Sequence, residues 1–191
     1  MSLKLNIIRS KEEIRKELIR QLREQDPSLR KDRSRKVQDE LLSSLEFKES
    51  RVVMAYVSLP TEVDTHYFIR KMLERGKKLA VPCINTVSQS IIASELTSID
   101  ELVEGPFGIH EPENGPAKAV SLKEIDLIVV PGIAFDRQNM RLGRGKGYFD
   151  RFLANEELSS SKTIGLAFSF QIVDALPVDA HDRPVHRVIS A

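Results

Sequence analysis

The segment Arg141–Asp150 reads RLGRGKGYFD and combines glycine with positive charge. It holds three of the chain's nine glycines within five residues, and three cations lie in the same ten-residue segment. Glycine has no Cβ, so its backbone can adopt positive φ and approach a ligand closely. Backbone N–H groups that turn inward form a concavity for anions, and cationic side chains add the charge that a phosphate group requires. The segment therefore predicts a loop that binds polyphosphate.

Neither common phosphate-binding motif explains this loop. The Walker A pattern G-x-x-x-x-G-K-[ST] and the G-x-G-x-x-G spacing are both absent. Because the loop matches neither motif, a flexible basic turn or an RNA contact of the RGG kind stays open as an alternative. Asp150 is the first acid after Asp136, and Asp182 lies in a loop before the last predicted strand. Two carboxylates, together with water and phosphate oxygens, suit Mg²⁺, although for Asp182 by itself a turn role is favoured.

Two further positions could belong to the same site. Lys11 and Arg15 lie four residues apart at the start of a predicted helix, hence on one face. Cations there oppose the helix dipole, and a bound polyphosphate would reverse that penalty. A solvated basic face explains the pair equally well. Glu62 follows the first predicted strand and could bind a polar heterocycle or merely close a surface turn.

The chain offers little for covalent or zinc chemistry. It contains no G-x-S-x-G sequence, and its histidines show no metal-ligand spacing. Cys83, the one cysteine, is expected to be a buried thiol. What remains is phosphate electrostatics with a hard metal, which is what phosphoryl transfer requires, because positioning and charge neutralisation supply most of its catalysis.

Composition limits the class of protein. With 191 residues, 41% hydrophobic and 30% charged, the chain fits one globular domain over residues 1–191. The net charge is +1, so any anion site must be local. The single cysteine excludes an internal disulfide, and no signal peptide or membrane-spanning run is evident. We therefore expect a cytoplasmic protein that does not bind membranes.

Helical patterns dominate the first part of the chain, about residues 11–45. Ser10 and Glu13 form a capping box ahead of Ile14, Leu18 and Leu22 at helical spacing, which predicts a helix over residues 11–24. A second pattern predicts a helix over residues 29–45. Its cations are interrupted by Asp32, which favours a solvated face.

From about residue 51 to residue 191 the pattern alternates between strands and helices. Strands are predicted at 52–57, 79–81, 91–95, 127–130, 163–167 and 185–189, helices at 65–75 and 148–157, and a long loop at 105–119. Short apolar strands alternating with helices favour a mostly parallel sheet in a three-layer α/β/α, Rossmann-like fold, preceded by the helical pair. Ligands bind beyond the carboxyl ends of such strands, where the glycine loop and Glu62 are expected to meet.

The chain resembles the 5-formyltetrahydrofolate cyclo-ligase family, also called methenyltetrahydrofolate synthetases, over nearly its whole length. The most specific part is Val130–Asp136 followed by Arg141–Asp150, which is similar to the family signature Pro-Gly-x-x-Phe-Asp…Arg-Leu-Gly-x-Gly-x-Gly-Tyr-Tyr-Asp. The resemblance implies ATP-dependent cyclisation of 5-formyltetrahydrofolate to 5,10-methenyltetrahydrofolate, with release of ADP and phosphate. The formyl oxygen would be phosphorylated on the way, and no protein nucleophile would be needed.

The resemblance also implies roles for individual residues. Catalysis would involve Arg144, Lys146 and Tyr148, and Mg²⁺ would be held by Asp150 and Asp182. Folate would contact Val57, Glu62, Arg144, Gly145, Lys146, Gly147 and Tyr148. ATP, the co-substrate, would contact Lys11, Arg15, Arg141, Leu142, Gly143, Arg144, Gly145, Lys146, Gly147, Tyr148 and Phe149. The expected partners are these small molecules and no nucleic acid, and the expected state is a monomer or a weak dimer.

Three positions depart from the family pattern. Phe149 stands where a second tyrosine is common, and Asn139 stands where glycine is usual. Asn tolerates the left-handed conformation, so the turn can survive this exchange. His186 stands where an acid is usual, which puts a metal or surface role for that position in doubt.

Two other functions compete with this interpretation. One is a different ATP-dependent kinase or ligase of a small molecule on a similar fold. The other is an RNA-binding module that uses the basic helices and the glycine loop. The net charge of +1 and the aromatic fraction of 6% argue against RNA binding, because a basic surface and stacking aromatics are expected there.

Overall fold

The N-terminal helix forms where the capping box predicts it. The structure is a computed structural model that describes residues 9–180 and 182–191. Helix α1 spans Lys11–Glu24, with the Ser10 side chain accepting from the Glu13 N–H and the Glu13 carboxylate accepting from the Ser10 N–H. Ile14, Leu18 and Leu22 are buried on one face. The predicted helix is confirmed, and it places Lys11 and Arg15 on its first turns.

The second predicted helix is broken near its end. Helix α2 spans Pro27–Ser43, and a short α3 spans Leu45–Glu49. Ser44 between them has an extended backbone, with ψ at 152°, and its hydroxyl accepts from the Phe47 N–H. Serine caps helices well, so the chain ends one helix and begins another there. Helix α4, His66–Glu74, confirms the helix predicted after the first strand.

A six-stranded sheet forms the centre of the molecule, in the order β11-β9-β6-β1-β2-β3. All neighbours are parallel except β2 and β3, which are antiparallel. The strands are β1 Val52–Ala55, β2 Lys78–Asn85, β3 Ser90–Glu95, β6 Leu127–Val130, β9 Lys162–Ala167 and β11 Arg187–Ser190. The predicted mixed α/β fold with a mostly parallel sheet is confirmed. The finer Rossmann-like grouping and the single-domain division stay predictions.

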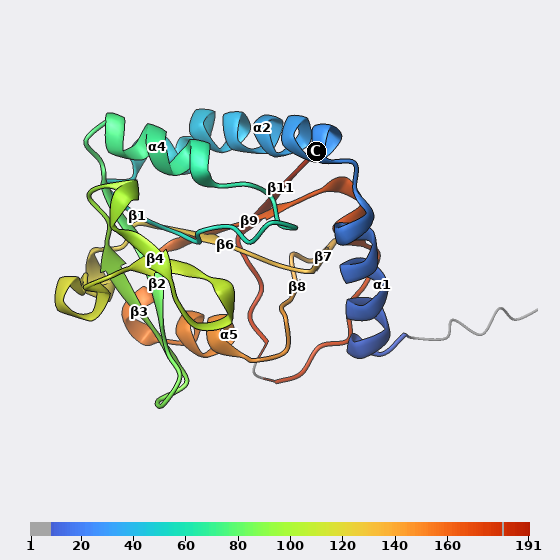
Figure 1. Ribbon diagram of the computed structural model, residues 1–191. Coiled ribbons are helices and arrows are strands. Elements are labelled where there is room, and N and C mark those ends of the chain that lie inside the picture. The colour runs from blue at the N-terminus through green and yellow to red at the C-terminus, as the bar shows by residue number, and fades with distance from the viewer. Residues whose placement is uncertain (1–8, 181) are drawn as a thin grey trace, which may run out of the picture.

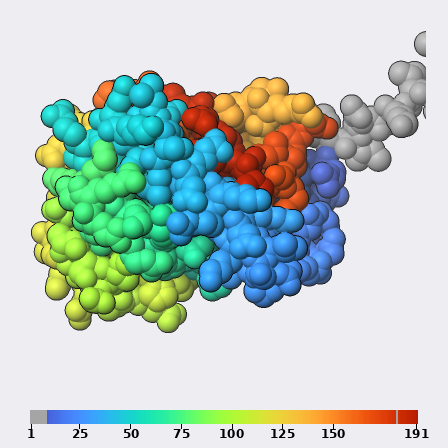
Figure 2. All heavy atoms as spheres, turned by 90° about the horizontal axis from the view of Figure 1, so that it is seen from above, coloured from blue at the N-terminus to red at the C-terminus, as the bar shows by residue number. Residues whose placement is uncertain are grey.

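Apolar side chains are buried on both faces of this sheet. In β1, Val53 and Ala55 belong to one hydrophobic cluster, whereas Val52 and Met54 belong to the other. This alternation follows from the strand repeat of two residues. In Figure 1, α2 and α4 lie over one face and α5 (Tyr148–Leu153) lies on the opposite side. Figure 2 shows the first of these faces covered by α2 (blue) beside α4 (green).

A small second sheet, in the order β10-β7-β8, was not predicted. Strand β7 spans Ala134–Asp136, β8 spans Arg141–Leu142 and β10 spans Ile172–Val173. The buried Asp136 carboxylate accepts from the N–H groups of Gln138 and Met140 across the β7–β8 turn. Asn139 takes positive φ in this turn, at 61°, as its tolerance of that conformation allows. The hairpin leads directly into the glycine loop.

Two further segments differ from the prediction. The segment 105–119, expected to be a loop, contains β5 (His110–Pro112), which pairs with β4 (Leu102–Glu104), and 3-10 turns at Pro106–Gly108 and Gly115–Lys118. Helix α5 ends at Leu153, because Asn155 caps a separate 3-10 turn by accepting from the Glu157 N–H. No helix among residues 9–180 and 182–191 is both long and apolar enough to span a membrane.

Candidate functional site

A pocket opens where the connections of the sheet change direction. From β1 the chain continues to β2, which pairs with one edge of β1, whereas β6 pairs with the other edge. The carboxyl ends of β1 and β6 therefore form a switch point, the usual binding position in an open α/β sheet. A cavity of about 280 Å³ lies there, lined by Tyr56 and Val57 after β1 and by Pro131 and Gly132 after β6.

The glycine loop forms another wall of this pocket. Gly145 and Gly147 have φ of 92° and 70°, values that an L side chain adopts only with strain. Gly147 then caps α5, so Tyr148 begins that helix. Arg15 on α1 donates from Nε to the Gly143 carbonyl at 2.9 Å. Arg15 therefore supports the loop from α1, although it is not part of the cavity wall.

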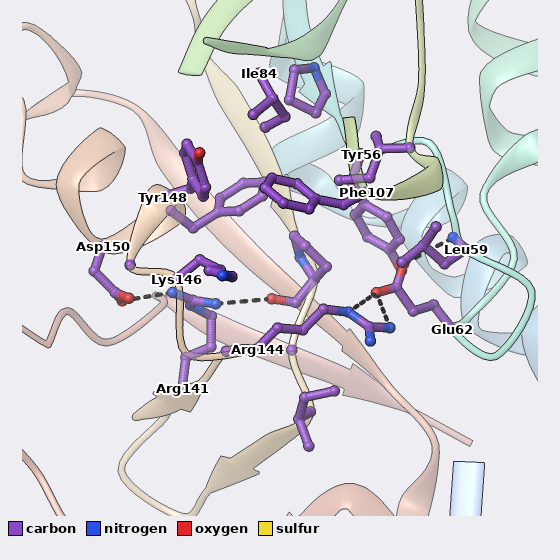
Figure 3. Close-up of a pocket in the computed structure, with 18 of the residues that line it drawn as sticks. Tyr56, Leu59, Glu62, Ile84, Phe107, Arg141, Arg144, Lys146, Tyr148 and Asp150 are labelled. Atoms are coloured by element: carbon purple, nitrogen blue, oxygen red, sulfur yellow. Dashed lines mark hydrogen bonds and ion pairs between the residues drawn. The ribbon is translucent and has the colours of Figure 1, made fainter. Parts of the chain in front are cut away.

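Arg141 and Asp150 form an ion pair at the two ends of the loop. Arg141 Nη2 lies 2.6 Å from Asp150 Oδ1, and Arg141 Nη1 donates to the Pro131 carbonyl at 3.3 Å. Both side chains line the cavity, and Figure 3 shows the pair on one side of it. The guanidinium therefore ties β8, α5 and the end of β6 together.

A second ion pair joins the loop to the segment after β1. Arg144 donates from Nε and Nη2 to Glu62 Oε1, at 3.2 and 2.9 Å. The Glu62 side chain is 11% exposed and the Arg144 side chain 43%. Figure 3 shows this pair on the opposite side of the pocket from Asp150. The sequence predicted that Glu62 and the glycine loop would meet, but not this ion pair, because 82 residues separate its partners.

Lys11 forms a third set of ion pairs, with the C-terminal loop. Its ammonium lies 2.6 Å from Asp179 Oδ2 and also contacts Asp182. Partial burial lowers the pKa of Lys11, but the hydrogen bonds to Asp179 and Asp182 outweigh burial and raise the pKa above its ordinary value. Lys11 is therefore held as a cation beside Asp182, and neither residue lines the cavity.

The donor set suits a hard cation that shares its shell with phosphate. Among the described residues, no group of three or more His, Cys, Asp or Glu side chains could hold a metal by itself. Mg²⁺ rarely needs such a cage, since one or two carboxylates with water and phosphate oxygens suffice. The Asp150 carboxylate, on the cavity wall, meets that requirement. Asp182, the other residue expected to hold the metal, lies outside the wall.

Apolar and aromatic side chains cover the rest of the cavity. Tyr56 is buried and donates from its hydroxyl to the Val63 carbonyl at 3.0 Å, and burial raises its pKa well above the ordinary value. Phe107 is 56% exposed, and its ring centroid lies 6.0 Å from that of Tyr148. Its backbone φ is 62°, an uncommon value for a bulky residue. Sequence reasoning missed Phe107, although a lone aromatic within the Gly- and Pro-rich segment was a usable signal.

The remaining candidates lie away from the cavity. His186 Nδ1 hydrogen-bonds the Thr163 N–H and hydroxyl, at 3.0 and 2.8 Å, and burial with the nearby Lys162 lowers its pKa. His186 therefore supports β9 from the final segment. Cys83 is buried, as expected, and burial raises its pKa to about 11. At neutral pH such a thiol stays protonated and inert.

Most predicted site residues meet at this one cavity. Its wall contains Val57, Glu62, Arg141, Gly143, Arg144, Lys146, Gly147, Tyr148, Phe149 and Asp150. The wall does not include Lys11, Arg15, Leu142, Gly145 or Asp182. The Leu142 side chain is buried in the hydrophobic core, and its carbonyl accepts from the Ile133 N–H. The ligand contacts of all these residues stay predictions.

Comparison with known proteins gives a consistent result. The sequence model of the 5-formyltetrahydrofolate cyclo-ligase family matches residues 7–191. The chain is 31% identical to mouse (Mus musculus) 5-formyltetrahydrofolate cyclo-ligase over 94% of its own length and 93% of the relative's. It is 30% identical to the Escherichia coli K12 protein of that name, over 74% and 78%. The solved structure of Aquifex aeolicus 5,10-methenyltetrahydrofolate synthetase superposes with a TM-score of 0.80 at 36% identity, covering 94% of this chain and 89% of the other.

Proposed function

The chain belongs to the 5-formyltetrahydrofolate cyclo-ligase family, and on that premise we propose that the cavity at the switch point is where ATP drives the ring closure. The protein converts 5-formyltetrahydrofolate and ATP into 5,10-methenyltetrahydrofolate, ADP and phosphate. The observation that carries the assignment is that Glu62, expected on the folate, and Lys146, expected on the phosphates, line the same cavity.

The chemical problem is that a formamide carbonyl is a poor electrophile with a poor leaving group. The formyl oxygen attacks the γ-phosphorus of ATP, the bond to ADP breaks, and the oxygen becomes part of a phosphate ester. N10 then attacks the formyl carbon and loses its proton, and the C–O bond breaks to release phosphate. This sequence requires no protein nucleophile, which agrees with the buried, protonated Cys83.

The protein's task is to position the two substrates and to balance charge. The formyl oxygen must lie in line with the γ-phosphorus, roughly 3–3.5 Å away. We assign the triphosphate to Arg144, Lys146 and the loop amides, with Lys11 and Arg15 on α1 behind them. These cations would stabilise the negative charge on the transferred group. Such electrostatic stabilisation of the transition state is usually the largest single contribution to catalysis.

The folate is assigned to the other walls of the cavity. Glu62 can accept hydrogen bonds from the amino group and ring N–H of a pterin, and Val57 borders it at the end of β1. Tyr148 and Phe107 offer aromatic faces close to each other, against which a flat ring can stack. Their position beside the glycine loop would bring the formyl group toward the phosphate-binding side.

We assign Mg²⁺ to Asp150 and Asp182, together with phosphate oxygens of ATP. The metal, when bound, would neutralise part of the triphosphate charge. Asp150 is oriented for this by Arg141, which occupies its Oδ1 atom. Asp182 would have to exchange its contact with Lys11 for the metal, so Lys11 would become available to a phosphate. A cytoplasmic location, a monomeric or weakly dimeric state and the lack of nucleic-acid partners stay predictions.

An absorbance assay tests the proposed function. Purified protein with 5-formyltetrahydrofolate, ATP and Mg²⁺ is expected to produce the near-ultraviolet absorbance of 5,10-methenyltetrahydrofolate, with one ADP formed for each product molecule. ADP formation without methenyltetrahydrofolate would instead indicate the alternative, a kinase or ligase of another small molecule.

A further inference from the structure

The ion pair between Glu62 and Arg144 connects the two substrate sides of the cavity. Glu62 belongs to the segment after β1, and Arg144 belongs to the glycine loop after β8. Arg144 places two donors on one carboxylate oxygen, Glu62 Oε1, at 3.2 and 2.9 Å. In this structure, the acid expected on the folate therefore neutralises the cation expected on the triphosphate.

The Glu62 carboxylate is held in place by its own turn. Its second oxygen, Oε2, accepts from the Leu59 N–H at 3.0 Å, which leaves Oε1 for Arg144. With 11% of the side chain exposed, solvent screens this carboxylate only partly. The Arg144 side chain, at 43%, is the more exposed partner. Arg144 is therefore the partner that can move when a ligand competes for Glu62.

Each expected ligand competes for one partner of this pair. A nucleotide that binds before the folate must draw Arg144 from Glu62, so part of its binding free energy is lost in breaking the contact. A pterin offers neutral N–H donors to Glu62 Oε1 and takes the place of Arg144 there. The guanidinium is then released beside the triphosphate position, where a charge-assisted bidentate contact is available.

We propose that the exchange of Glu62 from Arg144 to the pterin couples folate binding to ATP binding. The inference depends on the proposed function, because it uses the assigned ligands of both residues. Folate binding should tighten ATP binding, and by linkage ATP should tighten folate binding by the same factor. The consequence is that the protein holds ATP weakly until the folate to be phosphorylated is present.

Calorimetric titration of the protein with the Mg²⁺ complex of AMP-PNP, a non-hydrolysable ATP analogue, tests the coupling without turnover. For the unmodified protein, saturating 5-formyltetrahydrofolate is expected to tighten the analogue about three- to fivefold, the size expected for a partly exposed ion pair. Glu62→Gln keeps an oxygen for the Leu59 N–H but removes the charge. This variant is expected to bind the analogue about three- to fivefold more tightly than the unmodified protein when no folate is present.

A double-mutant cycle separates the effect of releasing Arg144 from the effect of removing the Glu62 charge. In an Arg144→Ala background, adding Glu62→Gln is expected to change analogue affinity by less than about 1.5-fold, because Arg144 is no longer there to be released. If Glu62→Gln tightened analogue binding equally in both backgrounds, the proposal would be overturned. The gain would then come from removing a negative charge near the nucleotide and not from releasing Arg144. The control is Glu124→Gln, which removes the partner of Lys78 away from the cavity and should leave analogue affinity unchanged.

Failure of the proposal and failure of the proposed function give different results. If the unmodified protein forms methenyltetrahydrofolate but binds the analogue equally well with and without folate, the coupling is wrong and the function stands. If it forms no methenyltetrahydrofolate and binds no folate, the assigned function fails, and the coupling that depends on it fails as well.

Discussion

Arg141 and Asp150 are held against each other at the two ends of the glycine loop, with 2.6 Å between Nη2 and Oδ1. Their side chains are 3% and 17% exposed, so the Arg141 guanidinium is far more buried than that of Arg144, whose side chain is 43% exposed. It closes the ten-residue segment into a loop whose ends are fixed, and Arg141 further anchors it to the Pro131 carbonyl. The shape of the phosphate-binding wall therefore depends on this pair.

Arg141→Ala is expected to lower the free energy of unfolding by about 3 kcal/mol, because it leaves the Asp150 charge poorly solvated and without its cation. Urea denaturation at neutral pH measures the change. The matched control is Arg137→Ala, which removes the exposed ion pair with Asp174 and should cost less than about 0.5 kcal/mol. Equal losses in the two variants would show that Arg141 does not hold the loop.

Lys146→Ala is expected to lower kcat by a hundredfold or more, because one lost charge-stabilising contact in a transition state costs about 2.7–4 kcal/mol. The absorbance assay under saturating substrates measures it. Lys123→Ala, which removes an exposed cation outside the cavity, is the control and should retain kcat. Near-normal kcat in Lys146→Ala would remove this residue from the mechanism.

Glu62→Gln is expected to raise KM for 5-formyltetrahydrofolate far more than KM for ATP. The amide can keep the Leu59 N–H bond, but it loses the charge that would hold the pterin donors. Steady-state kinetics with each substrate varied in turn measures the two constants. A similar rise in both constants would contradict the assignment of Glu62 to the folate.

Cys83 is expected to react with thiol reagents only when the protein unfolds. The side chain is 4% exposed, and burial raises its pKa to about 11, so the thiolate needed for reaction is scarce below pH 9. Modification by a chromogenic disulfide in native buffer and in urea measures the two rates. A fast native reaction that leaves turnover intact would show that the segment around β2 opens readily.

The sequence predicted those features that arise from local patterns. The capping box and apolar spacing located α1 to the residue, and the apolar run Leu127–Val130 located β6. The β7–β8 hairpin was missed because strands of two and three residues carry no detectable alternation. What holds that turn is the buried Asp136 carboxylate, an acid that composition alone would place at the surface.

The site was predictable as a set of residues but not as an arrangement. Glycine spacing and charge identified the loop, and the switch-point rule placed it near Glu62. The pairing of Arg144 with Glu62, and of Lys11 with Asp182, joins positions 82 and 171 residues apart, and no local pattern reports such contacts. Phe107 lines the cavity with a positive φ that its local sequence does not predict. These relationships arise from the tertiary fold.

The most direct test is a crystal structure with Mg²⁺, AMP-PNP and 5-formyltetrahydrofolate bound together. We expect the γ-phosphate against Lys146 and Arg144, the pterin on Glu62, and the formyl oxygen facing the γ-phosphorus in the same cavity. A triphosphate bound away from the glycine loop, or a pterin that leaves Glu62 paired with Arg144, would contradict this expectation.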